Sequence, residues 1–115
     1  MRRVNFETYN NAFSKISEIQ FLNAPSEFQS NRWLTCIQTP SFEFRENIRL
    51  GLEKENIESR PLWKPMHQQP IFQKYTSYIN GVSDNLFEKG LCLPSGSNLS
   101  KEDISFIIKC IKKLI

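Results

Sequence analysis

The sequence predicts an α/β domain of the α+β type, in which helices cover one face of a small mixed or antiparallel sheet. Helical apolar spacing alternates with short apolar runs, and no internal repeat is present. The chain has 115 residues, of which 39% are hydrophobic, so it is long enough to bury a core. We expect a single domain over residues 1–115, with an N-terminal helix at 2–17 and a small domain at 30–115.

The N-terminal helix is predicted from its apolar spacing. Phe6, Tyr9, Phe13 and Ile16 recur at intervals of three and four, which lines one face of an amphipathic helix. We expect the helix to end near Ser17.

A strand and a second helix follow. Arg32 to Thr39 is rich in aromatic and β-branched residues and contains no breaker, which is typical of a strand. Pro40 fits the first turn of the next helix with Thr39 as its cap, because the missing proline N–H is not needed there. Asn56 tolerates the left-handed conformation that closes helices. The expected core-facing stripe of this helix is Phe44, Ile48 and Leu52.

The segment from Arg60 to Gln69 is predicted to be irregular and extended. Pro61 and Pro65 lie inside this segment and Pro70 directly follows it. Each residue before a proline is driven out of the α region. The following residues, 72–79, predict at most a short helical turn.

The last third of the chain predicts a short helix and a strand. Ser83 is a candidate cap for a helix through Leu86 and Phe87, which Gly90 should end. The run from Leu91 to Pro94 is a candidate buried strand.

The final helix follows a turn at residues 95–98. Ser100 and Asp103 have the spacing of a capping box. The apolar face expected for this helix consists of Ile104, Ile107, Ile108, Ile111 and Ile115.

Composition argues against several classes of function. The net charge is +3, but the fifteen cations are scattered among twelve acids, whereas a nucleic-acid surface needs a contiguous basic stripe. No apolar run approaches the roughly 20 residues of a membrane span, and no signal-peptide core is present. We therefore expect a cytoplasmic protein.

The cysteines predict neither a metal site nor a disulfide framework. Cys36, Cys92 and Cys110 are odd in number and show no paired ligand spacing, and one histidine cannot complete a zinc site alone. We expect buried, reduced thiols.

The strip "RPLWKPMH" contains the strongest candidate for a binding site. Arg60 offers a planar fork for an anion, Trp63 a stacking surface and His67 a hydrogen-bonding ring. Together they are suited to a polar, anionic, ring-bearing ligand. The alternative is that Trp63 and Met66 pack under a surface loop while Arg60 pairs with a nearby acid, and the residues alone leave both readings open.

Three motifs carry a family resemblance. "NRWLT" at 31–35, "EKENIESRPLWKPMHQQPIF" at 53–72 and "LFEKGLCLPSGSNLSKED" at 86–103 resemble the C-terminal end of the DegT/DnrJ/EryC1/StrS aminotransferases. "RRVNFETY" at 2–9 is similar to the helix that leads into the small domain of this family. The resemblance implies the C-terminal domain of fold type I aminotransferases.

These enzymes use pyridoxal 5'-phosphate to transfer an amino group from glutamate to a keto sugar linked to a nucleoside diphosphate. The resemblance places the Schiff-base lysine and phosphate-binding groups in a large domain with no matching position here, so Lys64 is not that lysine. We expect no catalytic, cofactor-binding or metal residue in this chain. The substrate-facing residues implied are Asn31, Arg32, Arg60, Trp63, Met66 and His67.

Three hypotheses follow. The chain is the small domain of a sugar-nucleotide aminotransferase, inactive unless a partner chain supplies the large domain. Alternatively, it is a non-catalytic remnant that binds a sugar nucleotide or a protein. The third hypothesis, nucleic-acid binding, is supported only by the net positive charge of the chain. Because removal of a large domain bares an apolar face, we also expect a homo-oligomer, most simply a dimer.

Overall fold

A four-stranded sheet forms the centre of the molecule. The computed structural model describes residues 1–115, and its strands are β1 (Gln20–Phe21), β2 (Thr35–Gln38), β3 (Arg60–Pro61) and β4 (Gly90–Leu93). The strand order is β1-β2-β4-β3 and every neighbouring pair is antiparallel. The sheet is therefore antiparallel rather than mixed.

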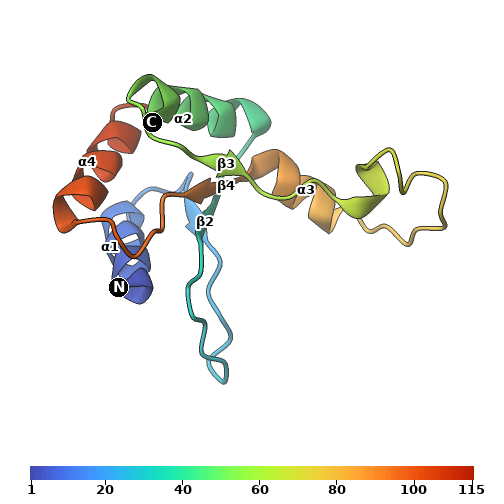
Figure 1. Cartoon of the computed structure of the whole chain (residues 1–115), viewed down its shortest axis with the longest axis horizontal. Helices are drawn as coiled ribbons and strands as arrows, with labels where there is room; N and C mark the ends of the chain where they lie inside the picture. The colour runs from blue at the N-terminus through green and yellow to red at the C-terminus, as the bar shows by residue number, and fades with distance from the viewer.

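Helices cover one face of this sheet. The α-helices are α1 (Arg2–Phe13), α2 (Phe42–Lys54), α3 (Val82–Lys89) and α4 (Lys101–Lys112), and a 3-10 turn, η1, spans Met66–Gln68. α1, α2 and α4 surround one side of the sheet, whereas α3 continues from its end toward a projecting loop (Figure 1). None of these helices has the length and hydropathy that crossing a membrane requires.

The core lies between the sheet and α1, α2 and α4. In β2, Thr35 and Ile37 are buried, whereas Cys36 and Gln38 between them are only half-buried. This period of two identifies the covered face, since successive strand residues point to opposite sides. The core cluster comprises Tyr9, Phe13, Ile19, Ile37, Ile48, Leu52, Leu91, Leu93, Ile104, Ile107, Cys110 and Ile111.

Predicted α2 is confirmed, but its first turn differs. Ser41, not Thr39, is the N-cap, and its hydroxyl accepts from the Phe44 N–H at 3.2 Å. Thr39 lies directly after β2, and its hydroxyl donates to the Lys89 carbonyl at 2.9 Å. Pro40 therefore precedes the cap. Asn56 closes the helix end in the left-handed region, at φ 58°, as predicted.

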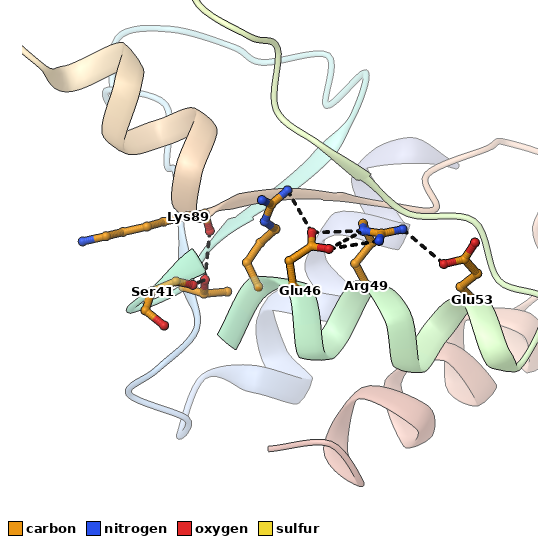
Figure 2. A network of polar contacts seen from close by, with 7 residues as sticks. Ser41, Glu46, Arg49, Glu53 and Lys89 are labelled. Atoms are coloured by element: carbon orange, nitrogen blue, oxygen red, sulfur yellow. Dashed lines mark hydrogen bonds and ion pairs between the residues drawn. The ribbon is translucent and has the colours of Figure 1, made fainter. Parts of the chain in front are cut away.

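One flank of α2 carries an ion-pair ladder. Arg49 bridges Glu46 at 2.9 Å and Glu53 at 3.2 Å, one turn to either side (Figure 2). These pairs stabilise the helix by a few tenths of a kcal/mol each, about 0.3–0.5, because they join opposite charges one turn apart.

Two other helix ends differ from prediction. α1 ends at Phe13 instead of Ser17, because the chain turns there and brings Ile19 into the core. α3 begins after Gly81, at φ 80°, without a side-chain cap. Ser83 consequently lies within the helix instead of capping it.

The remaining predicted ends agree with the structure. Gly90 ends α3 and starts β4. The capping box of α4 is present: Ser100 accepts from the Asp103 N–H and Asp103 accepts from the Ser100 N–H. Residues 72–79 contain no helix, only a turn in which the Tyr75 N–H donates to the Phe72 carbonyl at 3.0 Å.

The proline-rich strip is extended only in part. Gln69, which precedes Pro70, has the predicted extended backbone, with φ −81° and ψ 132°. The intervening residues 66–68 do not precede a proline, so they are free to form η1. This turn decides the direction of His67.

Candidate functional site

A cleft lies on the side of the sheet that the helices leave open. Its volume is about 680 Å³, and we call it the tryptophan cleft. Its walls come from the segment before β2, from β3 and the residues flanking it, and from α3 and β4. The lining residues used below are Trp33, Glu58, Arg60, Trp63, Phe87 and Cys92.

Two indole rings form one wall of the tryptophan cleft. The ring centroids of Trp33 and Trp63 are 6.2 Å apart and their planes are inclined by 30°. Exposed fractions of 60% and 66% leave most of both rings open to solvent. Large aromatic surfaces are normally buried, so a paired and exposed arrangement is typical of a binding surface.

The backbone fixes the position of both rings. The Trp33 N–H donates to Asn31 Oδ1 at 3.1 Å, and the Arg2 guanidinium donates to the Trp33 carbonyl. Trp63 follows Leu62, whose N–H donates to the Gly90 carbonyl at 3.3 Å and so extends the pairing of β3 with β4. The two tryptophans are thus anchored to different segments.

Arg60 lines the same cleft and is paired with an acid. Its Nε and Nη2 donate to Glu58 Oε1 at 2.8 and 2.6 Å, and both side chains are about three-quarters exposed. An exposed ion pair of this kind contributes roughly 0–1 kcal/mol. A phosphate or carboxylate can therefore replace Glu58 at little cost. Both sequence readings hold for Arg60, since it pairs with an acid and lines the cleft.

His67 does not share this opening, which corrects the expectation that it points with Arg60 and Trp63. η1 directs it toward α3, where its Nε2 hydrogen-bonds Asp84 Oδ1 at 2.8 Å. The Gln68 amide donates to the same oxygen. The hydrogen bond from His67, and then that from Gln68, hold the pKa of Asp84 below its usual value. The cluster ties the strip to α3.

The other three predicted residues also lie outside the cleft lining. Met66 is 59% exposed and contacts the Gln69 amide. Arg32 places its guanidinium 3.6 Å from the centroid of the Phe6 ring and donates to the Leu22 carbonyl at 3.1 Å. Asn31 accepts from the Trp33 N–H, so its contribution to the cleft is to position that ring.

Sequence reasoning did not place Trp33, Phe87 or Cys92 among the site residues, although all three line the cleft. Trp33 had a usable signal, since it directly follows Asn31 and Arg32, which were both predicted to face the substrate. Phe87 was predicted only as part of a short helix, and Cys92 was expected to be a buried thiol, whereas it is half-buried. The position of Cys92 in the cleft follows from the strand register, which places it opposite Arg60, and Phe87 reaches the cleft from α3.

The cleft does not fit pyridoxal phosphate as a covalently held cofactor. No lysine lines it, and its one cation, Arg60, is paired with Glu58. Schiff-base formation requires a lysine amine at the site. No group of three or more histidine, cysteine, aspartate or glutamate side chains could hold a metal ion.

Comparison with known proteins identifies the family. The model of the DegT/DnrJ/EryC1/StrS aminotransferase family matches residues 1–112. The chain belongs to this family. The resemblance predicted from the three motifs is thereby confirmed, and the family is one of aminotransferases that use pyridoxal phosphate.

Two curated relatives support the assignment. The chain is 37% identical over 117 aligned residues to EpsN of Bacillus subtilis (strain 168), which is named as a pyridoxal phosphate-dependent aminotransferase. The match covers 98% of this chain and 30% of EpsN. The chain is 33% identical to GDP-perosamine synthase of Escherichia coli O157:H7, over 70% of this chain and 22% of that protein. The chain thus spans less than a third of these relatives.

Solved structures give the same answer for the fold. A DegT DnrJ EryC1 StrS aminotransferase from Brucella abortus superposes with a TM-score of 0.83 at 25% identity, covering 97% of this chain and 30% of that one. The aminotransferase TlmJ from Streptoalloteichus hindustanus reaches a TM-score of 0.87 at 18% identity, over 97% and 30% of the two chains. The predicted fold class is therefore confirmed.

Proposed function

We propose that the chain is the small C-terminal domain of a sugar-nucleotide aminotransferase and that its tryptophan cleft is the outer wall of the substrate site. The observation that carries the proposal is the convergence of two exposed indole rings and Arg60 on one cleft. GDP-perosamine synthases, among the relatives, are named for a GDP-linked amino sugar. A ligand of this class combines stacking rings with a diphosphate.

Each part of the cleft matches a part of such a ligand. The rings of Trp33 and Trp63 stack on the nucleobase or cover the apolar face of the sugar, and Arg60 pairs with the diphosphate after leaving Glu58. Met66 and His67 lie on the same strip and Asn31 and Arg32 lie beside Trp33, although none of the four lines the cleft. We keep these four as candidates for contacts with the distal part of the sugar nucleotide.

Chemistry in this proposal requires a large domain from another chain or segment. The activity assigned to the complete enzyme is amino transfer from glutamate to a keto sugar linked to a nucleoside diphosphate. Pyridoxal phosphate supplies the electron sink for that reaction. Because no lysine lines the cleft, we propose that this chain binds substrate without catalysis by itself.

Exposed apolar side chains support an assembled state. Trp33 and Trp63 are accompanied by exposed Ile71, Tyr75 and Tyr78 on the projecting loop. Apolar surface of this kind favours association, so we propose contact with a large-domain partner or a second copy of the chain. The three free cysteines accord with a cytoplasmic location.

A non-catalytic sugar-nucleotide binding module is the second candidate. It requires only the cleft that this chain presents, with its two indole rings and Arg60. The two candidates differ in whether a large domain must be present for the chain to act.

Calorimetric titration of the chain with GDP-mannose tests the shared part of the proposal. We expect saturable binding that is weakened at least tenfold in Arg60→Ala and Trp63→Ala. Lys109→Ala, which removes an exposed cation from α4, is the matched control and should leave binding unchanged. Equal affinities in all four chains would refute the site.

Absorbance tests the catalytic part. After the chain is mixed with pyridoxal phosphate, reduced with borohydride and freed of excess cofactor, we expect no pyridoxyl group fixed stoichiometrically on one lysine, and the unreduced mixture should show no transamination. Stoichiometric labelling of a single lysine would show that this chain holds the cofactor, contrary to the proposal. Recovery of activity when the large domain is supplied would distinguish the split enzyme from the binding module.

A further inference from the structure

Two thiols face each other on the open side of the sheet. Cys36 of β2 is the direct cross-strand partner of Cys92 of β4. Their sulfur atoms are 3.6 Å apart, so one thiol hydrogen-bonds the other. Both residues are half-buried, and Cys92 lines the tryptophan cleft, which gives a small solute access to the pair.

The strand register places this pair where a cross-link fits. The Thr39 N–H donates to the Lys89 carbonyl at 3.0 Å, so Thr39 and Lys89 form a hydrogen-bonded pair. Hydrogen-bonded and non-hydrogen-bonded pairs alternate along an antiparallel ladder, which makes Cys36 and Cys92 a non-hydrogen-bonded pair. The Cα separation of such pairs, about 4.5 Å, lies within the range of roughly 4.4–6.8 Å that disulfides span. Side-chain rotation alone can bring the sulfurs together.

We propose that Cys36 and Cys92 are a redox modification site, which hydrogen peroxide closes to a disulfide in the floor of the tryptophan cleft and thiol reductants reopen. The proposal concerns the reactivity of this pair. It holds whether or not the cleft binds a sugar nucleotide.

The contact between the thiols assigns their roles. The hydrogen bond from Cys92 lowers the pKa of Cys36, and the hydrogen bond to Cys36 raises the pKa of Cys92. Cys36 is therefore the thiolate that attacks peroxide. An S–O bond forms as the O–O bond breaks, which leaves Cys36 as a sulfenic acid and releases hydroxide that becomes water.

The second step closes the disulfide. Once Cys36 is a sulfenic acid, it no longer carries the negative charge that opposed ionisation of the Cys92 thiol. The Cys92 sulfur attacks the Cys36 sulfur, and the departing hydroxide combines with the Cys92 proton as a second water. Two electrons pass from the thiol pair to peroxide, which is fully reduced to water.

Cys110 provides an internal contrast. It is buried in the core on α4 and is not part of the pair. It should remain a thiol under the same conditions. The disulfide would cross-link β2 to β4 directly opposite Arg60, so its formation would also alter the floor of the cleft.

Thiol counting after treatment of the full chain with hydrogen peroxide tests the site. We expect the count under denaturing conditions to fall from three to one, with peptides containing Cys36 and Cys92 linked in the monomer. Dithiothreitol should restore three thiols, and the oxidised chain should unfold several degrees higher because the cross-link restricts its unfolded state. Three unreacted thiols, linkage through Cys110, or linkage only between chains would overturn the proposal.

Variants test the order of the two steps. In Cys92→Ser, Cys36 should accumulate as a sulfenic acid that dimedone traps, whereas Cys110→Ser should still form the disulfide. Absence of the dimedone adduct in Cys92→Ser would contradict the assigned roles. Peptide mapping of the unmodified sequence requires no substitution, so it decides the proposal even if a variant does not fold.

Discussion

Trp33 and Trp63 lie on opposite sides of α2 in the sequence, yet their ring centroids are 6.2 Å apart across one cleft. They are the only two tryptophans of the chain. Intrinsic fluorescence excited at the indole band therefore reports on the tryptophan cleft alone. This relationship gives the proposed site a reporter that needs no label.

Ligand binding should change this fluorescence. GDP-mannose is expected to quench the emission with a saturable concentration dependence, because a stacked nucleobase deactivates an indole. Trp33→Phe and Trp63→Phe should each lose part of the emission and keep a saturable response. Mannose alone is the control and should have no effect. A loss of emission that grows in proportion to the absorbance of the added nucleotide, without saturation, would contradict binding at the rings.

Glu58 should oppose the binding of anions, because its carboxylate occupies the Arg60 guanidinium inside the cleft. Glu58→Gln frees Arg60, and an exposed ion pair of roughly 0–1 kcal/mol corresponds to an affinity gain of up to about fivefold. Calorimetry with GDP-mannose measures the gain. Glu55→Gln makes the same change of net charge outside the cleft, so equal gains in both variants would assign the effect to net charge.

Leu52 and Leu50 form a matched pair for the core. Leu52 is fully buried in the core cluster, whereas Leu50 on the same helix is 45% exposed. Leu52→Ala should lower the free energy of unfolding by about 2–5 kcal/mol, because it leaves a cavity. Leu50→Ala should cost less than about 1 kcal/mol. Urea unfolding measures both, and equal losses would contradict the assignment of the buried face of α2.

Gly90 and Gly51 form a second matched pair. A Cβ at Gly90 would overlap the Leu62 side chain and the Leu86 carbonyl oxygen, whereas at Gly51 it would meet only the side chain of Leu114 near the chain end. Gly90→Ala should therefore destabilise the fold by about 1–3 kcal/mol. Gly51→Ala should cost less, because its flexible neighbour can move and alanine favours the helix. The reverse order in urea unfolding would contradict the packing of β4.

The hydrogen bonds to Asp84 predict an acid-sensitive fold. Because its pKa is lowered in the folded chain, the ionised carboxylate stabilises the fold above the pKa of the unfolded chain, where the usual value is 3.8. That contribution is lost as the pH falls through the lower, folded pKa. When the pH is lowered from neutral to strongly acidic, the free energy of unfolding should therefore fall less in Asp84→Asn than in the parent chain.

Urea unfolding at both pH values checks the role of Asp84. Glu88→Gln removes a carboxylate from the same helix without affecting His67 and is the control. If Asp84→Asn and Glu88→Gln showed identical pH dependence, the cluster with His67 would not be the cause.

Local signals account for the parts of the fold that the sequence predicted. Ile48 and Leu52 are spaced at the helical period in α2, and Ser100 and Asp103 have the spacing of a capping box in α4. Each feature is therefore encoded within one short segment. β1 and β3 are two residues long and exist only because they pair with β2 and β4. Pairing between distant segments leaves almost no local signal.

The same distinction explains the candidate site. Arg60 and Trp63 were predicted from one proline-rich strip, and both line the cleft. His67 turns away because η1 and Asp84, on another helix, decide its direction. Trp33 joins Trp63 only after the strands pair, which no spacing in the sequence expresses.

The most direct test of the central claim is a ¹H–¹⁵N correlation spectrum of the chain titrated with GDP-mannose. The account predicts that both indole N–H signals and the amide signals of Arg60 and Cys92 shift together along one saturation curve, while those of Ile107 in α4 stay in place. Uniform small shifts, or shifts confined to α2 and α4 with both indole signals unmoved, would contradict it.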